Sequence, residues 1–303
     1  MRVLLLFPMA DGQTGPAIRS AFEELGHIVR AVDAKLHPGN SYAVAHLFKP
    51  DLIFCSRTAP LASQVIAIKK KFPNAIACTW QLDTRPSIDH WAHLFPLIRA
   101  CDYYFIVASR LIPEWEKINP NTFWLPQGLQ DRVYNKPKEI TDKDRQKYAC
   151  DVSWAGNRGF PHEFRGAFLD AIAGAGVSFK QWGCGGNPQV YNEEHNKMVA
   201  LSKINLAISG WPENEKYTSV RNYKIMGAGG FCLELGRKGL QDIFPPDILD
   251  TYLSPTDIVD QIHHWLSHDK ERKTIAEKGY EWVRGNATYT HRIKTALEYM
   301  GIN

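Results

Sequence analysis

Two basic residues, Arg221 and Lys224, stand three positions apart just before a glycine-rich segment, in "YTSVRNYKIMGAGGFCLEL". In a helix their side chains lie on one face. Arg can grip a phosphate with two hydrogen bonds, and the amino end of a helix adds backbone N–H groups. Ser219 is placed to cap that helix and also to reach a phosphate. The segment predicts a site for a phosphate-bearing ligand, with two solvated surface cations as the alternative.

Gly229 and Gly230 follow this helix and allow two interpretations. Helices commonly end in a glycine with positive φ, which is a structural role. The missing side chains also let the backbone approach a bound phosphate closely. We therefore include both glycines among the candidate binding residues.

A second group of candidates lies in "AGNRGFPHEFR", where small residues follow a predicted strand. Gly156, Asn157 and Arg158 belong to the loop, and Arg165 belongs to the helix after it. Basic side chains here can bind an anion or form an ordinary charged helix face. The segment "KQWGCGG" ends another predicted strand and contributes Trp182 and Gly183, with Trp182 equally suited to a core position.

Two carboxylates are candidates for chemistry in the first part of the chain. Asp11 lies in the glycine-rich "MADGQTG" after the first predicted strand, and Asp83 lies in "WQLDTRP" after a later one. A carboxylate at the end of a strand can take a proton from a hydroxyl group or bind that hydroxyl. An Asp in a loop also commonly bonds the local backbone. His90 and His93 have no visible partner ligand, so no metal site is predicted.

The elements that carry these residues alternate between strand and helix. Short apolar runs such as "RVLLLF" and "DLIFCS" are separated by helical stretches over the first 130 residues, and the alternation restarts at "DVSWAG". This pattern predicts an α/β fold with two tandem Rossmann-like domains, each with a parallel sheet covered on both faces. The polar segment 135–149 is the predicted linker, between domains at 1–140 and 150–285. Parallel sheets bind ligands beyond the carboxyl ends of their strands, so two facing domains would share a cleft.

Composition sets wide limits. The chain has 303 residues and a formal net charge of +4, which permits an anionic ligand without requiring nucleic acid. No apolar run approaches the roughly 18 residues of a membrane span. The six cysteines are scattered and form no CxxC pair, and with no export signal we expect a reduced, cytoplasmic protein.

The ordered set of segments from 150 to 300 resembles the group 1 glycosyltransferases of the spore-maturation-protein type, which have the GT-B architecture. Three segments follow one another in the same order as in the family: "WAGNRGFPHEFR", "SKINLAIS" and "RNYKIMGAGGFCLEL". The family's carboxyl-terminal pattern is matched by the segment that begins at "GLQDIF" and ends at "KGYEWV", and by the later "ATYTHR". In the first domain, "WQLDTRP" and "WLPQGLQDRVY" resemble family loops more weakly.

The resemblance implies a glycosyltransferase that moves a sugar from a nucleotide sugar to a hydroxyl-bearing acceptor, which would be a glycan, a small molecule, a protein or DNA. It implies a diphosphate role for Arg165 and a loop facing the nucleobase at Trp182. It also implies that the nucleotide sugar is a co-substrate, that no cofactor or bound metal is needed, and that the helix within 286–303 returns to the first domain. Related enzymes often carry Glu where Lys224 stands, and Lys cannot accept hydrogen bonds from ribose.

Three rival functions stay open at this point. A dinucleotide-binding oxidoreductase is disfavoured because no GxGxxG motif follows the first predicted strand. A non-catalytic nucleotide-sugar-binding protein would need the same donor site. A glycosyltransferase that modifies hydroxylated bases of DNA is the third, and a basic rim on the first domain would support it.

Overall fold

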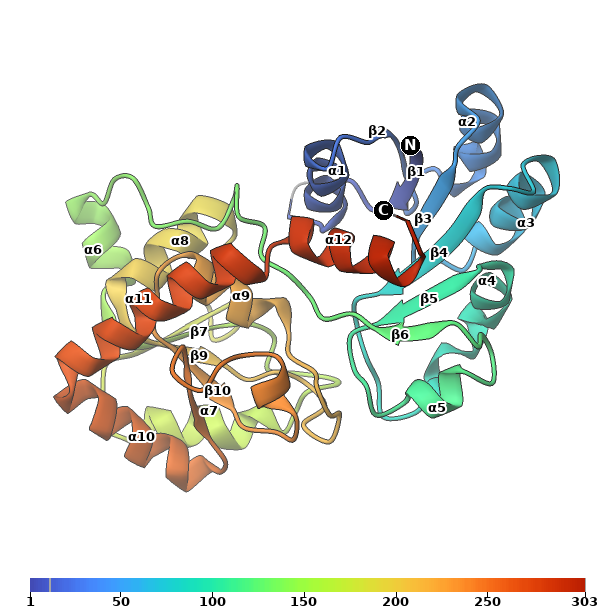
Figure 1. Cartoon of the computed structure of the whole chain (residues 1–303). Helices are drawn as coiled ribbons and strands as arrows, with labels where there is room; N and C mark the ends of the chain where they lie inside the picture. The colour runs from blue at the N-terminus through green and yellow to red at the C-terminus, as the bar shows by residue number, and fades with distance from the viewer. Residues whose placement is uncertain (11, 303) are drawn as a thin grey trace. The chain divides into compact units, whose positions relative to one another are not determined.

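A computed structural model describes residues 1–10 and 12–302, and the chain divides into two compact units (Figure 1). Unit 1 comprises Met1–Gln127 and Tyr289–Asn303, and unit 2 comprises Gly128–Thr288. Each unit is built on one parallel sheet with helices on both faces, so the prediction of two Rossmann-like α/β domains is confirmed.

The sheet of unit 1 has six parallel strands in the order β2-β1-β3-β4-β5-β6. The strands are β1 (Arg2–Phe7), β2 (Ile28–Asp33), β3 (Leu52–Ser56), β4 (Ile76–Gln81), β5 (Tyr103–Ile106) and β6 (Thr122–Trp124). The helices are α1 (Gly15–Glu24), α2 (Ser41–Phe48), α3 (Leu61–Lys71), α4 (Phe95–Ala100), α5 (Ile112–Trp115) and α12 (Tyr289–Tyr299), with 3-10 turns η1 (Pro38–Asn40) and η2 (Ile88–Leu94).

The central strand β1 shows why its sequence is a continuous apolar run. Val3, Leu5 and Phe7 pack into one cluster that includes side chains of α1 and α12. Leu4 and Leu6 point the other way, into a cluster with side chains of α2 and α3. Successive side chains of a strand alternate between faces, so a strand covered on both sides needs apolar residues throughout.

The sheet of unit 2 has five parallel strands in the order β11-β10-β9-β7-β8. The strands are β7 (Cys150–Ala155), β8 (Phe179–Trp182), β9 (Ser202–Ala207), β10 (Cys232–Leu235) and β11 (Asp250–Tyr252). The helices are α6 (Asp142–Tyr148), α7 (Arg165–Ala173), α8 (Asn192–Leu201), α9 (Val220–Gly227), α10 (Pro255–Ser267) and α11 (Asp269–Asn286), with the 3-10 turn η3 (Leu240–Asp242).

The division between the units lies at Gln127, earlier in the chain than the predicted linker at 135–149. That polar segment carries α6, which begins with a reciprocal capping box between Thr141 and Asp144. The helix is anchored on α8 by the ion pair of Asp144 with Lys197, at 3.0 Å. Charged residues therefore mark a surface helix of unit 2 here, because capping and ion pairs take the place of an apolar face.

Helix α12 belongs to unit 1 although it follows all of unit 2 in sequence. It lies beside α1 (Figure 1), and Tyr289, Ile293 and Ala296 are buried in the cluster under β1. Its start is fixed by Arg292, whose Nε donates to the Gln127 carbonyl oxygen at 2.8 Å. Among the described residues no helix combines the length and the apolar character that a membrane span requires.

Candidate functional site

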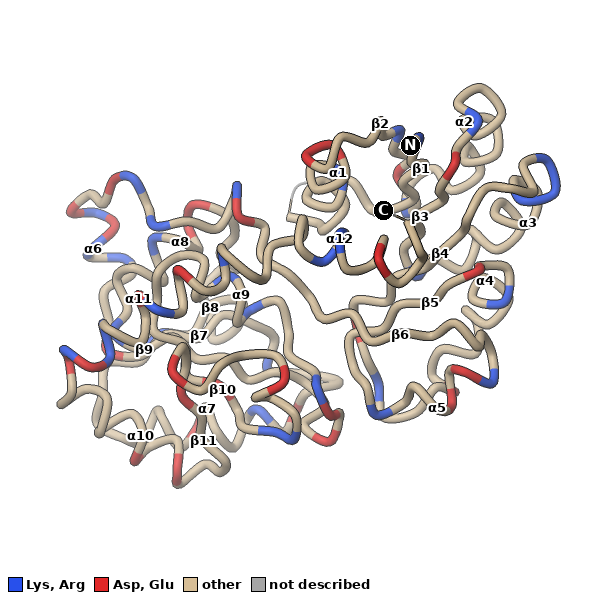
Figure 2. Tube along the Cα trace, in the orientation of Figure 1, with Lys and Arg blue, Asp and Glu red and all other residues tan. Residues whose placement is uncertain are grey.

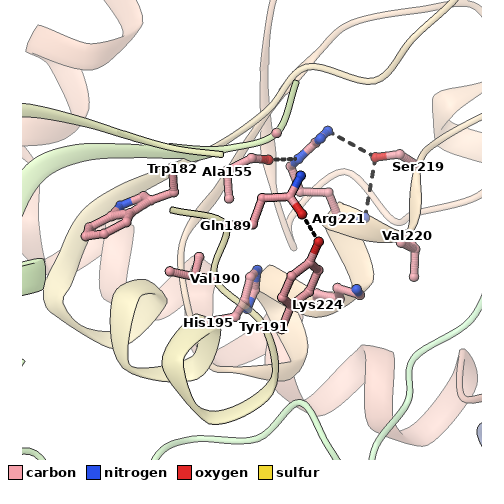
Figure 3. Close-up of a pocket in the computed structure, with 11 residues that line it drawn as sticks. Ala155, Trp182, Gln189, Val190, Tyr191, His195, Ser219, Val220, Arg221 and Lys224 are labelled. Carbon is pink, nitrogen blue, oxygen red and sulfur yellow. Dashed lines mark hydrogen bonds between the residues drawn. The ribbon is translucent and has the colours of Figure 1, made fainter. Parts of the chain in front are cut away.

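Unit 2 contains a cavity of about 180 Å³ at the carboxyl ends of β7 and β8 (Figure 3). Five of the predicted binding residues line it: Gly156, Trp182, Ser219, Arg221 and Lys224. The rest of the lining is Ala155, Val220, the segment Gln189–Tyr191 and His195. The cavity therefore joins the opening stretch of α9 to the loops after two strands of the sheet.

The amino end of α9 forms one wall of this cavity. Ser219 has extended backbone and is the N-cap, because its hydroxyl accepts a hydrogen bond from the backbone N–H of Arg221 at 3.4 Å. The backbone N–H of Ser219 donates in turn to Oγ of Ser209 at 3.0 Å. A helix amino end carries partial positive charge and favours an anion. The predicted capping role of Ser219 is confirmed.

Arg221 is held by uncharged oxygen atoms. Its Nε donates to the carbonyl oxygen of Ala155 at 2.8 Å, and its Nη1 lies 3.4 Å from that of Ile208 and 3.3 Å from Oγ of Ser219. The guanidinium thus bridges the ends of β7 and β9 and lies over the Trp154 ring at 5.9 Å. Burial lowers the pKa of Arg221, because desolvation disfavours the charged form.

Lys224 lies one helical turn further along α9 and also reaches the cavity. Its Nζ sits 4.5 Å from the centre of the Tyr134 ring, which is a cation–π contact. Burial, followed by repulsion from Arg221, lowers the pKa of Lys224 to about 8. In the described part of the chain neither Lys224 nor Arg221 forms an ion pair. Burial lowers the pKa of Arg221 more than the opposing charge of the buried Glu234 carboxylate raises it.

A buried carboxylate supports the base of α9 without entering the cavity. Glu234 on β10 accepts hydrogen bonds from Nδ2 of Asn222 at 2.6 Å and from Oγ of Ser209 at 3.1 Å. It also pairs with Arg237 at 3.2 Å, and both side chains are fully buried. Burial raises the pKa of Glu234. One signal in the sequence marks this residue: it is a charge inside the apolar strand "FCLEL".

His195 is a cavity residue that the sequence analysis missed. It comes from α8 and is 4% exposed, and its Nδ1 has no hydrogen-bond partner among the described residues. Its ring meets the edge of Tyr134 with centroids 5.2 Å apart. Burial, with repulsion from Lys224 and Arg221, lowers the pKa of His195 to about 3, so the imidazole is neutral. No local sequence pattern marks it, because tertiary packing brings α8 to the site.

Arg165 was predicted to contact the diphosphate, and the structure gives it a different position. Its guanidinium is buried and donates to the carbonyl oxygens of Ile208 at 3.0 Å and Asn157 at 2.8 Å. Burial and the nearby Arg221 lower the pKa of Arg165 to about 10. It does not line the cavity; instead it ties the loop after β7 to the end of β9 and adds positive potential behind Arg221.

Three other predicted residues of these loops also lie outside the lining. Arg158 is exposed and pairs with Asp170 at 2.5 Å, so the plain alternative of a charged surface residue fits it. Oδ1 of Asn157 accepts from the backbone N–H of Gly159 at 2.9 Å and shapes the loop. Gly183 has φ of +82°, and a Cβ there would lie 2.9 Å from Cγ of Gln189, so its bare backbone makes room for the cavity wall.

Gly229 and Gly230 lie at the opposite end of α9 from the cavity. Gly229 has φ of +79°, and the backbone N–H of Gly230 donates to the carbonyl oxygen of Ile225 at 3.0 Å. A Cβ on Gly230 would lie 2.3 Å from Cγ1 of Val199. The structural interpretation therefore holds for this pair: they end the helix and let β10 approach its neighbours.

The two predicted catalytic carboxylates belong to unit 1. Asp83 follows β4, and its half-exposed carboxylate forms an ion pair with Arg57. The Arg57 guanidinium lies 4.9 Å from the centre of the Trp91 ring. Asp83 therefore stands at the carboxyl edge of its sheet, as predicted. Asp11 lies outside the described residues.

The chain is similar to known proteins both in its sequence and in its fold. Residues 163–298 match the family model described as glycosyl transferase-like. HepE of Anabaena, solved with UDP and glucose, is 11% identical, with a TM-score of 0.67 over 99% of each chain. Sucrose-phosphate synthase of Thermosynechococcus elongatus is 10% identical, with a TM-score of 0.67 over 99% of each chain. The DNA-modifying enzyme β-glucosyltransferase is 10% identical, with a TM-score of 0.63 over all of both chains.

No curated protein sequence matches the chain. At these identities the structural likenesses establish the fold, and the family match covers residues 163–288 of unit 2, which include most of the cavity lining. Fold and family match together define the class: the chain has the GT-B fold, and residues 163–298 match a glycosyl transferase-like family. The family match further disfavours the oxidoreductase alternative.

Proposed function

We propose that the protein transfers a sugar from a uridine-diphosphate sugar to a hydroxyl-bearing acceptor, and that the cavity of unit 2 binds the donor. The observation that carries the proposal is a pair of partly buried cations, Arg221 and Lys224, which line the cavity and form no ion pair among the described residues. A cation that is partly removed from water and has no ion-pair partner is costly, so the arrangement favours an anionic ligand. Structural neighbours that bind UDP and UDP-glucose support uridine diphosphate as that ligand.

The chemistry assigned to each residue follows from its position. The acceptor oxygen forms a bond to the anomeric carbon, the bond from that carbon to the β-phosphate oxygen breaks, and UDP leaves with the electron pair. Arg221, Lys224 and the N–H groups at the start of α9 stabilise the negative charge that develops on the leaving diphosphate. Arg165 keeps the surrounding loop in place. Trp182 provides an apolar wall for the nucleobase.

The acceptor's proton must go to a base, and Asp83 is our proposal for that role. Its carboxylate follows a strand of unit 1 at the edge where parallel sheets bind ligands. We also propose that the reaction needs no bound metal, because the two cations and the helix end supply the positive charge. Chelator treatment should then leave the rate of UDP release unchanged.

We also propose a subfamily, a cellular location and an acceptor class. The spore-maturation-protein type stays our prediction for the subfamily, and the cytoplasm stays the predicted location, which the free state of all six cysteines suits. DNA is the second candidate acceptor, because the DNA-modifying β-glucosyltransferase has the same fold. Figure 2 shows Lys and Arg interspersed with Asp and Glu along unit 1, apart from the basic end of α3. This distribution favours a less charged acceptor than DNA.

A two-part experiment tests the proposal. Thermal melting with a panel of nucleotide sugars identifies the donor, since a ligand at 100 times its dissociation constant adds about 2.7 kcal/mol to the stability of the folded state. UDP release is then measured with and without candidate acceptors. Stabilisation by a UDP-sugar together with acceptor-dependent release is the expected result. Stabilisation without any release would leave the non-catalytic binding protein as the better account.

A further inference from the structure

We propose that His195 recognises the ribose of the donor nucleotide, with its Nδ1 hydrogen-bonded to a ribose hydroxyl group. This inference rests on the proposed function, because it assumes a nucleoside diphosphate in the cavity. It assigns a specificity-determining contact to α8, in a family whose donor segment lies on α9.

The first support is an unsatisfied polar atom inside the binding cavity. The His195 side chain is more than nine-tenths buried and lines the cavity, while its Nδ1 lacks a hydrogen-bond partner in the described part of the chain. A buried polar atom left unpaired costs about 1–3 kcal/mol, so such atoms are nearly always paired. A ligand that enters the cavity would supply the missing partner of this atom.

The second support is the order of side chains along the cavity. Figure 3 shows Trp182 at one end and Ser219 with Val220 at the other, and the His195 ring stands between them. A nucleoside diphosphate has its ribose between its base and its diphosphate. With the diphosphate at the amino end of α9 and the base beside Trp182, the ribose comes to lie next to His195.

The third support is the chemistry of the neighbouring side chain. The ammonium group of Lys224 can donate hydrogen bonds but cannot accept them. A neutral imidazole has one nitrogen that donates and one that accepts, and a ribose hydroxyl can do either. Burial and the two cations, Lys224 and Arg221, hold His195 in this neutral form by lowering its pKa to about 3. His195 therefore supplies, next to Lys224, the hydrogen-bond acceptor that the ammonium group assigned to the diphosphate cannot provide.

The ring of His195 is also fixed in orientation. Tyr134 meets it edge to face, with 82° between the ring planes, and the same Tyr134 ring carries the Lys224 ammonium group at 4.5 Å. One aromatic ring thus sets the position of both groups. This fixed ring carries a nitrogen atom, Nδ1, that is buried at the cavity wall and has no hydrogen-bond partner among the described residues.

Isothermal titration of the full-length protein tests the inference with four probes: UDP, 2′-deoxy-UDP, 3′-deoxy-UDP and inorganic pyrophosphate. The wild type should bind UDP about tenfold more tightly than at least one deoxy analogue. His195→Phe keeps an aromatic ring but removes both nitrogens, and it should bind UDP no better than that analogue. Its affinity for pyrophosphate should equal that of the wild type. His195→Asn places an amide near the position of Nδ1 and should restore part of the preference for UDP.

The outcomes separate the two proposals. If His195→Phe keeps the wild-type ratio of UDP to deoxy-UDP affinity while UDP binding itself persists, His195 does not recognise the ribose, and this inference alone is overturned. If the wild type binds neither UDP nor pyrophosphate, the proposed function fails and this inference fails with it. Circular dichroism of both variants checks the fold. If His195→Phe is unfolded, the ratio of UDP to deoxy-UDP affinity is measured with His195→Asn instead.

Discussion

At the scale of single residues, the site depends on two cations that the fold partly removes from water. Arg221 and Lys224 have lowered pKa values because burial penalises their charged forms. An anion bound in the cavity would offset the cost of desolvating these two charges. The spacing of Arg221 and Lys224 in the sequence indicated that they share a helix face. Their burial could not be predicted, because it comes from contacts with Trp154, Tyr134 and the ends of neighbouring strands.

Lys224 gives a prediction about pH. Its pKa in the free protein is about 8, below the ordinary 10.5, and an anion binds the protonated form. As pH rises above about 8, binding must take up a proton, so UDP affinity should fall by up to about tenfold per pH unit. The phosphate itself has its last ionisation near pH 6 and does not contribute there. Titration of UDP from pH 7 to 9.5 measures the slope.

Lys224→Arg is the matched variant for this experiment. Arginine stays charged throughout the range, so its profile should be flat. A wild-type profile as flat as that of the variant would show that Lys224 does not hold the diphosphate.

Glu234 gives a second prediction at this scale. It accepts from Asn222 and Ser209 and pairs with Arg237, all in the interior, so it positions the start of α9. Glu234→Gln leaves Arg237 buried without its counter-charge, and we expect a loss of about 3–5 kcal/mol in the free energy of unfolding. Urea unfolding measures it. A loss below 1 kcal/mol would mean that the network contributes little.

At the scale of elements, α9 performs two tasks with its two ends. Its amino end, capped by Ser219, faces the cavity, and its carboxyl end, at Gly229, closes the helix so that β10 can begin. The glycines looked equally suited to ligand binding in the sequence, because the same residue type ends helices and admits phosphates. Only the three-dimensional position separates the two roles.

Gly230 therefore gives a prediction that separates stability from binding. A Cβ at this position would lie 2.3 Å from Val199 and 2.7 Å from Asn205. Gly230→Ala should lower the free energy of unfolding by about 1–3 kcal/mol through overpacking. UDP affinity should stay within twofold of the wild type. A large loss of UDP affinity in a variant of normal stability would show that Gly230 contributes to ligand binding.

Much of the element order was predictable, for a physical reason. Strands such as β1 and β3 are buried on both faces, which forces apolar runs that stand out from the helices between them. The segment 135–149 was misread as a linker, because α6 is held by a capping box and ion pairs instead of an apolar stripe. His195 and Tyr134 were not predicted at all, since they meet only through packing between distant segments.

At the scale of the whole molecule, donor binding and proton removal are assigned to different units. The cavity belongs to unit 2, and Asp83 belongs to unit 1. Asp83→Asn should lower turnover by roughly 10²–10⁴-fold, which is the usual contribution of a general base, while UDP affinity is unchanged. Initial rates of UDP release with a productive acceptor measure this. Turnover near that of the wild type would remove Asp83 from the chemistry.

The central claim is that two partly buried cations in unit 2, Arg221 and Lys224, hold a nucleotide diphosphate. Isothermal titration of UDP, uridine and pyrophosphate into Arg221→Ala tests it most directly, with Lys203→Met as the control because Lys203 is an exposed cation of the same unit, paired with Asp151. A charge-assisted hydrogen bond contributes about 1.5–3 kcal/mol, so Arg221→Ala should weaken UDP and pyrophosphate binding by roughly tenfold or more. Uridine affinity should be unchanged, as should all affinities of the control. Wild-type affinity of a folded Arg221→Ala variant for UDP would contradict the account.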